Sequence, residues 1–203
     1  MSNNFDLYKQ SLVQWRDYSA IYIGTVEPTW DKLDIPWQQT FCIEEIPTND
    51  NWGTTSTVLH MWLEEKFVEW NNIKEATEHQ MSISPKLDFD ISSIINILQC
   101  QEHLCNFMQI PNGRLIPWHC DTYGHFVKTF NAAAQNLSRA IVFMENWTFG
   151  QTVQLGNSVL SHWKAGDIYS WDNEAWHGAA NFGNQPFTIM QITYDKTTNT
   201  SKS

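Results

Sequence analysis

The chain has few basic residues, and this shortage narrows the classes of partner that it can have. Lys and Arg number 12 against 22 Asp and Glu, so the formal net charge is −10. Only three of the basic residues are arginines: Arg16, Arg114 and Arg139. Proteins that bind nucleic acid neutralise its phosphates with Lys and Arg, so this composition argues against a nucleic-acid partner.

Long apolar runs are absent as well. No stretch approaches the ~20 apolar residues that a membrane-spanning helix needs, so we expect neither a transmembrane segment nor a membrane partner. The first residues, Met-Ser-Asn-Asn-Phe-Asp, do not show the charged stretch followed by an apolar stretch that is typical of a secretory signal peptide. Both absences predict a cytoplasmic protein.

Cysteine is scarce, with four residues: Cys42, Cys100, Cys105 and Cys120. Without a secretory signal we expect free thiols in a reducing compartment rather than disulfides. Cys100 and Cys105 have no matching second pair, so the spacing does not favour a structural zinc site.

Aromatic residues are plentiful, and the first half of the chain shows helical periodicity. The 203 residues include 11 Trp and are 42% hydrophobic, which is enough for a sizeable core in one domain. An amphipathic pattern predicts a helix from Ser56 to about Gln80, with further helices at 5–20 and at 91–103, the last capped by Asp90. Short apolar runs at 21–24 and 39–43 predict strands.

From residue 105 the pattern changes to short apolar runs separated by turn residues. Pro111-Asn112-Gly113 separates two of these runs, which is a hairpin signal, and Gly156-Asn157 predicts a second hairpin. Strands are expected at 105–110, 114–119, 139–144, 151–155, 158–161, 168–171, 176–181 and 187–194. About eight short strands favour a jelly roll over a parallel sheet.

The predicted fold is therefore mainly β with flanking helices, a double-stranded β-helix in a single domain of residues 1–203. Within it we expect a helical and strand support region at 1–104, a jelly-roll core with a metal site at 105–194, and a mobile polar tail at 195–203.

The candidate site begins with His119-x-Asp121. Side chains two residues apart on an extended segment point to the same side, so this histidine and this carboxylate can bind one ion together. His177, in Trp176-His177-Gly178, would complete a set of two imidazoles and one carboxylate. That set leaves three positions of an octahedral ion open, as non-haem Fe(II) oxygenases require. The alternatives are a hydrogen-bonded surface pair, or His125 as a rival ligand.

Three motifs together carry a resemblance to a known family: His119-x-Asp121, the Trp-x-x-Gly-Asp stretch at 163–167, and Asp172 leading to His177 and Asn181. The region from about 105 to 194 resembles the Fe(II)/2-oxoglutarate-dependent dioxygenase superfamily, closest to its aspartyl/asparaginyl β-hydroxylase and prolyl-hydroxylase-like branches. The resemblance implies Fe(II), 2-oxoglutarate and dioxygen. It also implies hydroxylation of an unactivated C–H bond in an amino acid or in a protein or peptide side chain.

One departure from the family concerns the cation that holds the distal carboxylate of 2-oxoglutarate. Family members usually place Arg or Lys about ten residues after the second histidine, but Phe187 and Thr188 stand here, and no basic residue lies between His177 and Lys196. By resemblance we assign the role to Arg139, with a hydroxyl hydrogen bond from Thr188. The alternatives are that Arg139 pairs with an acidic neighbour, or that Arg114 takes the role.

Two other functions stay open. One is a metal-dependent cupin-like enzyme that does not use 2-oxoglutarate, which the missing downstream cation favours. The other is a non-catalytic jelly-roll binding module, since the fold alone does not determine function. Aromatic residues cluster in sequence around the candidate ligands, as substrate walls or as core: Trp118, Tyr123, Trp147, Trp171 and Trp176. The sequence does not determine the substrate or the oligomeric state.

Overall fold

The computed structural model describes residues 19–30, 35–41, 74–119, 121, 123–173 and 175–198. These residues form two antiparallel sheets. The larger contains, in spatial order, β1 (Ile21–Thr25), β9 (Asp167–Asp172), β6 (Leu137–Phe143), β11 (Phe187–Asp195), β4 (His103–Ile110), β3 (His79–Ile83) and β2 (Gln39–Phe41). The smaller contains β5 (Arg114–His119), β10 (His177–Asn181), β7 (Gln151–Leu155) and β8 (Ser158–Leu160).

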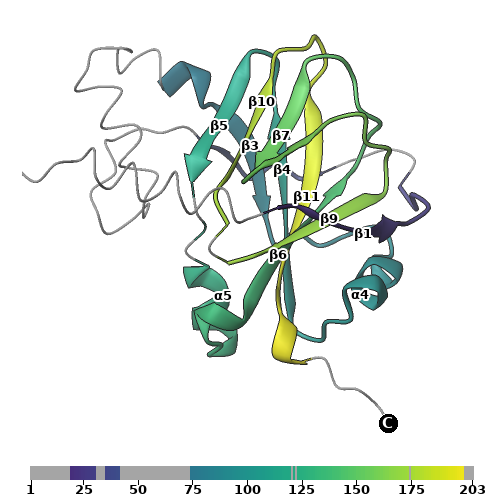
Figure 1. The fold of residues 1–203 in the computed structure, drawn as a ribbon, viewed down its shortest axis with the longest axis vertical. Helices are drawn as coiled ribbons and strands as arrows, with labels where there is room; N and C mark the ends of the chain where they lie inside the picture. Colours follow the sequence, from purple (N-terminus) through teal and green to yellow (C-terminus); the bar gives the residue numbers. More distant parts are fainter. Residues whose placement is uncertain are drawn as a thin grey trace, which may run out of the picture.

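The chain passes repeatedly from one sheet to the other, from β4 to β5, from β6 to β7 and from β9 through β10 to β11. Figure 1 shows the two sheets facing each other, with β5, β10 and β7 in front of β4 and β11. This winding is the double-stranded β-helix, so the predicted fold class is confirmed. The strands β1, β2 and β3, which precede residue 105, belong to the larger sheet.

The space between the sheets is filled from both sides. Ile141 and Phe143 of β6 meet Val153 and Leu155 of β7, and all four are buried. Because side chains alternate along a strand, Arg139 lies on the same inner face of β6 as Ile141 and Phe143. All seven residues of β6 are buried, which agrees with the predicted strand packed on both faces.

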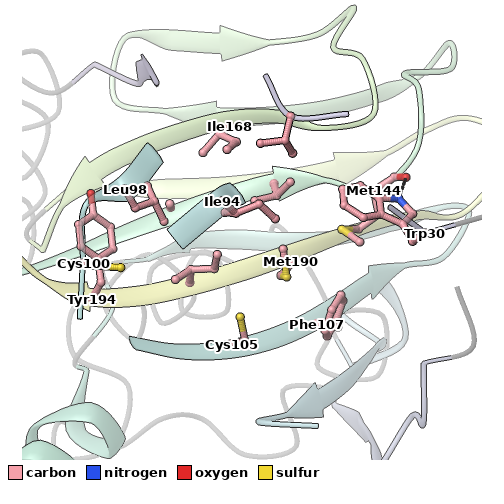
Figure 2. Packing of buried hydrophobic residues seen from close by; sticks show 14 of the residues in the cluster. Trp30, Ile94, Leu98, Cys100, Cys105, Phe107, Met144, Ile168, Met190 and Tyr194 are labelled. Atoms are coloured by element: carbon pink, nitrogen blue, oxygen red, sulfur yellow. Dashed lines mark hydrogen bonds between the residues drawn. The ribbon is translucent and has the colours of Figure 1, made fainter. Parts of the chain in front are cut away.

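The outer face of the larger sheet is covered by α4 (Ser92–Leu98), as Figure 2 shows. Ile94 and Leu98 of this helix pack in one cluster with Phe107 of β4 and with Met190 and Ile192 of β11. A second short helix, α5 (Gly124–Phe130), follows β5 and buries Phe126. In the part of the chain that the structure describes, no helix is long and apolar enough to cross a membrane.

The turn at 111–113 joins the two sheets, so the predicted hairpin is wrong. β4 and β5 belong to different sheets and are not paired with each other. The turn is held instead by Asn181 at the end of β10, whose carbonyl accepts from the Gly113 N–H at 2.8 Å and whose amide donates to the Ile110 carbonyl at 2.9 Å. The hairpin at Gly156-Asn157 is confirmed by the pairing of β7 with β8.

The helix boundaries also differ from the predictions. The helix at 91–103 ends at Leu98, because Gln99 adopts a left-handed conformation with φ of 51°, and residue 103 begins β4. The N-cap residue is Ile91, without a side-chain cap, so the predicted capping position of Asp90 is wrong by one residue; Asp90 nevertheless accepts a hydrogen bond from the Ser92 N–H at 2.9 Å. The helix expected to end near residue 80 is wrong at that end, because His79 begins β3.

Several expected features lie outside the described residues: the helix at 5–20 up to residue 18, the helix at 56–80 up to residue 73, and the end of the tail. The tail itself does not begin at 195. Asp195 is buried at the end of β11 and accepts from the Thr197 N–H at 2.7 Å, and Lys196 pairs with Asp172 at 2.8 Å.

Candidate metal centre

Three side chains meet at one end of the smaller sheet. His119 ends β5 and His177 begins β10, and the two residues are direct partners across these strands, with ring centroids 4.2 Å apart. Asp121 lies two residues beyond β5. His119 Nε2 is 3.8 Å from Asp121 Oδ1, and His177 Nε2 is 3.6 Å from Asp121 Oδ2. One donor atom from each residue lies within 4.8 Å of the others, so the group can hold a metal ion.

The backbone determines which nitrogen of each ring faces this centre. His119 Nδ1 lies 2.8 Å from the Pro117 carbonyl oxygen, and His177 Nδ1 lies 2.9 Å from that of Ala175. A carbonyl oxygen can only accept, so each Nδ1 carries a hydrogen, and in the neutral ring each Nε2 then presents a lone pair. His177 Nε2 is buried and has no hydrogen-bond partner among the described residues. Metal-ligating histidines are oriented in this way.

A β-bulge brings His119 to the inner face. His177 pairs with His119, but Ala179 pairs with Ile116, so β5 has one extra residue between these pairs. Direct partners point to the same side of a sheet, so His119 faces inwards with Ile116 although three positions separate them. Simple alternation along β5 would turn His119 away from Ile116.

Gly178 lies opposite this bulge and allows β5 to come close. A Cβ atom on Gly178 would lie 2.9 Å from the Ile116 carbonyl oxygen and 3.4 Å from backbone atoms of Pro117 and Trp118. These neighbours are backbone atoms, which cannot move away as the end of a side chain can. The glycine next to His177 therefore determines how near the two histidine-bearing strands lie.

Arg139 reaches the centre from the larger sheet. Its Nη2 lies 2.8 Å from Asp121 Oδ2, its Nη1 donates to Gln191 Oε1 at 3.2 Å, and its guanidinium carbon lies 5.2 Å from the centroid of the Tyr123 ring. Arg139 is thus paired with an acidic neighbour, one of the two alternatives that the sequence left open. Among the described residues, it is the only buried Arg or Lys.

The charges around the centre favour the protonation states that bind a cation. Burial raises the pKa of Asp121, but the charge of Arg139 and the interactions with His177 and His119 outweigh it and lower that pKa to about 2. Burial, together with His119, lowers the pKa of His177 to about 4. At neutral pH the carboxylate is therefore ionised and His177 is neutral, as metal ligation requires.

Thr188 is not brought to the centre, which corrects its predicted role. Side chains alternate along β11, so Thr188 lies on the same outer face as Met190 while Gln191 lies on the inner face. The Thr188 hydroxyl accepts from Gln109 Nε2 at 3.3 Å, and its N–H donates to Glu145 Oε2 at 2.9 Å. Gln191, which sequence reasoning missed, could have been found by the same alternation.

The other candidates also lie elsewhere. Arg114 pairs with Glu75 at 3.4 Å at the opposite end of β5. His125 is exposed on α5 and is not a member of the group that can hold a metal ion, so it is not a rival ligand. Trp171, one of the aromatic residues noted in the sequence, does border the centre: its ring centroid lies 5.0 Å from that of His177.

Comparisons with known proteins show similarity in fold alone. No protein-family model and no curated protein matches the chain. Similar solved structures include a prolyl-4-hydroxylase from Pseudomonas putida, with 12% identity and a TM-score of 0.46 over 78% of this chain and 91% of that one. A predicted oxalate decarboxylase from Thermotoga maritima has 15% identity and a TM-score of 0.37 over 58% and 81%. The Cnp3 cupin domain from Schizosaccharomyces pombe has 8% identity and a TM-score of 0.37 over 59% and 66%. Similarities of this size carry no argument about activity.

Proposed function

We propose that this protein is an Fe(II)- and 2-oxoglutarate-dependent dioxygenase that hydroxylates an unactivated C–H bond. The observation that carries the proposal is the convergence of His119, Asp121 and His177, with both Nε2 lone pairs and an ionised carboxylate directed at one point. Two histidines and one carboxylate on one side of an ion, with open positions opposite, are the ligand set of non-haem Fe(II) oxygenases.

The spacing of the donor atoms fits an ion. Ligands about 2 Å from a metal and at right angles lie roughly 3 Å from each other. The two histidine–carboxylate separations are 3.8 and 3.6 Å, so small side-chain rotations bring all three donors within bonding distance. The buried Nε2 of His177, without a partner among the described residues, would gain one in the ion.

The chain's own residues would hold and orient the reactants. His119, Asp121 and His177 would bind the iron, and the positive charge of Arg139 beside Asp121 would keep that carboxylate ionised. Bound iron with 2-oxoglutarate and dioxygen supplies an oxidant for a C–H bond, with succinate and carbon dioxide as co-products. The side chains packed between the two sheets would exclude water from this oxidant. The expected substrate is an amino acid or a protein or peptide side chain.

We propose Arg139 as the residue that holds a carboxylate of 2-oxoglutarate. Its side chain lies on the inner face of the roll beside the metal ligands, and its Nε has no hydrogen-bond partner among the described residues. The position that usually carries the cation in the family is here Phe187 and Thr188, both buried, and Thr188 lies on the outer face.

One observation favours a second candidate, a metal-dependent enzyme of the same fold that does not use 2-oxoglutarate. Both terminal nitrogens of Arg139 are already engaged, with Asp121 at 2.8 Å and with Gln191 at 3.2 Å. A bidentate contact with the distal carboxylate would require Arg139 to release one of them.

Spectroscopy under anaerobic conditions separates the two candidates. Addition of Fe(II) and then 2-oxoglutarate should produce the weak visible charge-transfer band of the chelate, and the His119→Ala protein should not show it. Release of succinate from 2-oxoglutarate in air is the second readout. Iron binding that 2-oxoglutarate leaves unchanged would favour the second candidate and contradict the first.

A further inference from the structure

Two buried hydrogen-bond donors beside the metal centre have no partner among the residues that the structure describes. Arg139 Nε and Trp171 Nε1 are both enclosed, and neither has a hydrogen-bond partner within the described ranges. Arg139 is 7% exposed and Trp171 is 3% exposed. A buried N–H without an acceptor costs about 1–3 kcal/mol, so donors of this kind usually serve a ligand, an ion or ordered water.

The two residues that carry these donors lie side by side. Arg139 of β6 and Trp171 of β9 are direct partners across neighbouring strands, so their side chains point to the same face. That face is the inner one, because Trp171 packs in the cluster between the sheets and Arg139 reaches Asp121. The Trp171 ring also lies 5.0 Å from the ring of His177. Both residues therefore lie between the two sheets, beside the metal centre.

We propose that Trp171 Nε1 and Arg139 Nε together bind one carboxylate group of a small ligand beside the metal. Two oxygens of a carboxylate can accept from two separate donors, and Trp offers a donor without a competing acceptor. The identification of this ligand as 2-oxoglutarate rests on the proposed function. The assignment of Trp171 as a binding residue rests on its own burial and position.

The charge at the centre favours an anion over a neutral group. Arg139 carries one positive charge and Asp121 one negative charge, so a bound divalent cation leaves the enclosed site positive. Interactions of a ligand carboxylate with this excess charge are strong because the surroundings are buried. A neutral ligand or a single water would satisfy the donors but not balance the charge.

The test removes one donor and keeps the aromatic ring. Trp171→Phe lacks the N–H, and Trp163→Phe is the matched control, because Trp163 is 4% exposed in the same cluster and stacks on Phe143 at 3.9 Å. Calorimetry on the anaerobic Fe(II)-loaded proteins measures the affinity for 2-oxoglutarate and for glutarate, which has both carboxylates but no keto group. Iron affinity and the melting temperature are measured for all three proteins.

We expect Trp171→Phe to bind both acids about tenfold more weakly, since a hydrogen bond to a charged group is worth about 1.5 kcal/mol or more. Its iron affinity should change less than about twofold, and Trp163→Phe should bind both acids as the wild type does. If glutarate binding depends on Trp171 while 2-oxoglutarate binds no more tightly than glutarate, this inference stands and the proposed function fails. Equal affinity of the wild type and Trp171→Phe for 2-oxoglutarate, or no binding of either acid to the wild type, overturns the inference.

Discussion

At the residue scale, hydrogen bonds to the backbone prepare the candidate ligands before any ion is bound. Two carbonyl oxygens hold the hydrogens of His119 and His177 on Nδ1, and Arg139 holds Asp121 ionised. A ligand set in the correct tautomer and charge state needs little rearrangement when it binds a metal. These polar groups are buried. The free energy of unfolding should therefore depend on pH, and it should fall when the partner of a buried charge is removed.

The metal-free protein should lose stability in acid because of His177. Its pKa in the folded protein is about 4, below the ordinary 6.5, so the unfolded chain binds the proton more readily. The free energy of unfolding should therefore fall as the pH drops from 6.5 to 4, by on the order of 3 kcal/mol from this residue. Asp121 adds a further loss between pH 3.8 and about 2.

Urea denaturation between pH 7.5 and 4 measures this effect. His177→Gln should have a shallower dependence than the wild type, and His125→Gln, at an exposed position of α5, should have the same dependence as the wild type. Equal slopes for His177→Gln and the wild type would show that His177 titrates normally.

Removal of the Arg139 side chain should be costly. Arg139→Met leaves Asp121 without the partner at 2.8 Å, and breaking a buried ion pair typically costs about 3–5 kcal/mol. Arg114→Met is the control, because its pair with Glu75 at 3.4 Å is largely exposed and contributes less than about 1 kcal/mol. Denaturation midpoints at pH 7 measure both, and a similar small loss in both variants would contradict the structure.

At the scale of elements, the position of the centre depends on the bulged pair β5 and β10. The extra residue in β5 turns His119 inwards, and the missing side chain of Gly178 lets the bulge lie against β10. The two histidines thus come from strand ends that are 58 positions apart in sequence but directly paired in the sheet. Separation of the two strands would separate the two Nε2 atoms.

Gly178→Ala should weaken metal binding as well as stability. The added methyl group would press on the backbone of Ile116 and Pro117, at an expected cost of about 1–3 kcal/mol, and would displace His119 from His177. We expect at least a tenfold loss in affinity for Fe(II) or Mn(II), measured by calorimetry.

Gly124→Ala is the matched control for that variant. A Cβ on Gly124 would meet nothing within 4 Å, and Gly124 begins α5 close in sequence to the centre. Alanine should leave the metal affinity unchanged and stabilise the helix by up to about 1 kcal/mol. Equal metal affinity in both alanine variants would show that strand spacing does not control the site.

At the scale of the whole molecule, the roll joins residues from β1 near the start of the described chain to β11 near its end. A metal ion at the centre would bind β5 and β10 of the smaller sheet and, through Asp121 and Arg139, connect them to β6 of the larger one. An ion that binds the folded chain and not the unfolded one stabilises the entire domain.

Metal addition should therefore raise the melting temperature. A free ion concentration of about 100 times the dissociation constant adds about 2.7 kcal/mol, or roughly 5–10 °C for a domain of this size. A chelator should reverse the rise, His119→Ala should abolish it, and His125→Ala should keep it. A melting temperature that no divalent ion changes would instead favour a binding module without a functional metal site.

The sequence alone contained the candidate ligands and the class of fold. The spacing of His119 and Asp121, the later His177, and short apolar runs broken by turn residues were enough to predict a metal site in a jelly roll, because side-chain chemistry and strand periodicity are local properties. Helix ends and the turn at 111–113 were less predictable. Gln99 ends the helix in a left-handed conformation that a non-glycine residue does not announce, and the turn is held by Asn181, which is 71 positions from Ile110 in sequence.

Only the tertiary structure decided which side chains share the centre. Alternation along β5 would have turned His119 outwards, and a bulge opposite Gly178 turned it inwards. Strand pairing placed Arg139 and Trp171 side by side, and alternation along β11 left Thr188 on the outer face. Which faces meet is a property of sheet registers, and registers are determined by the packing of the whole domain rather than by any one segment.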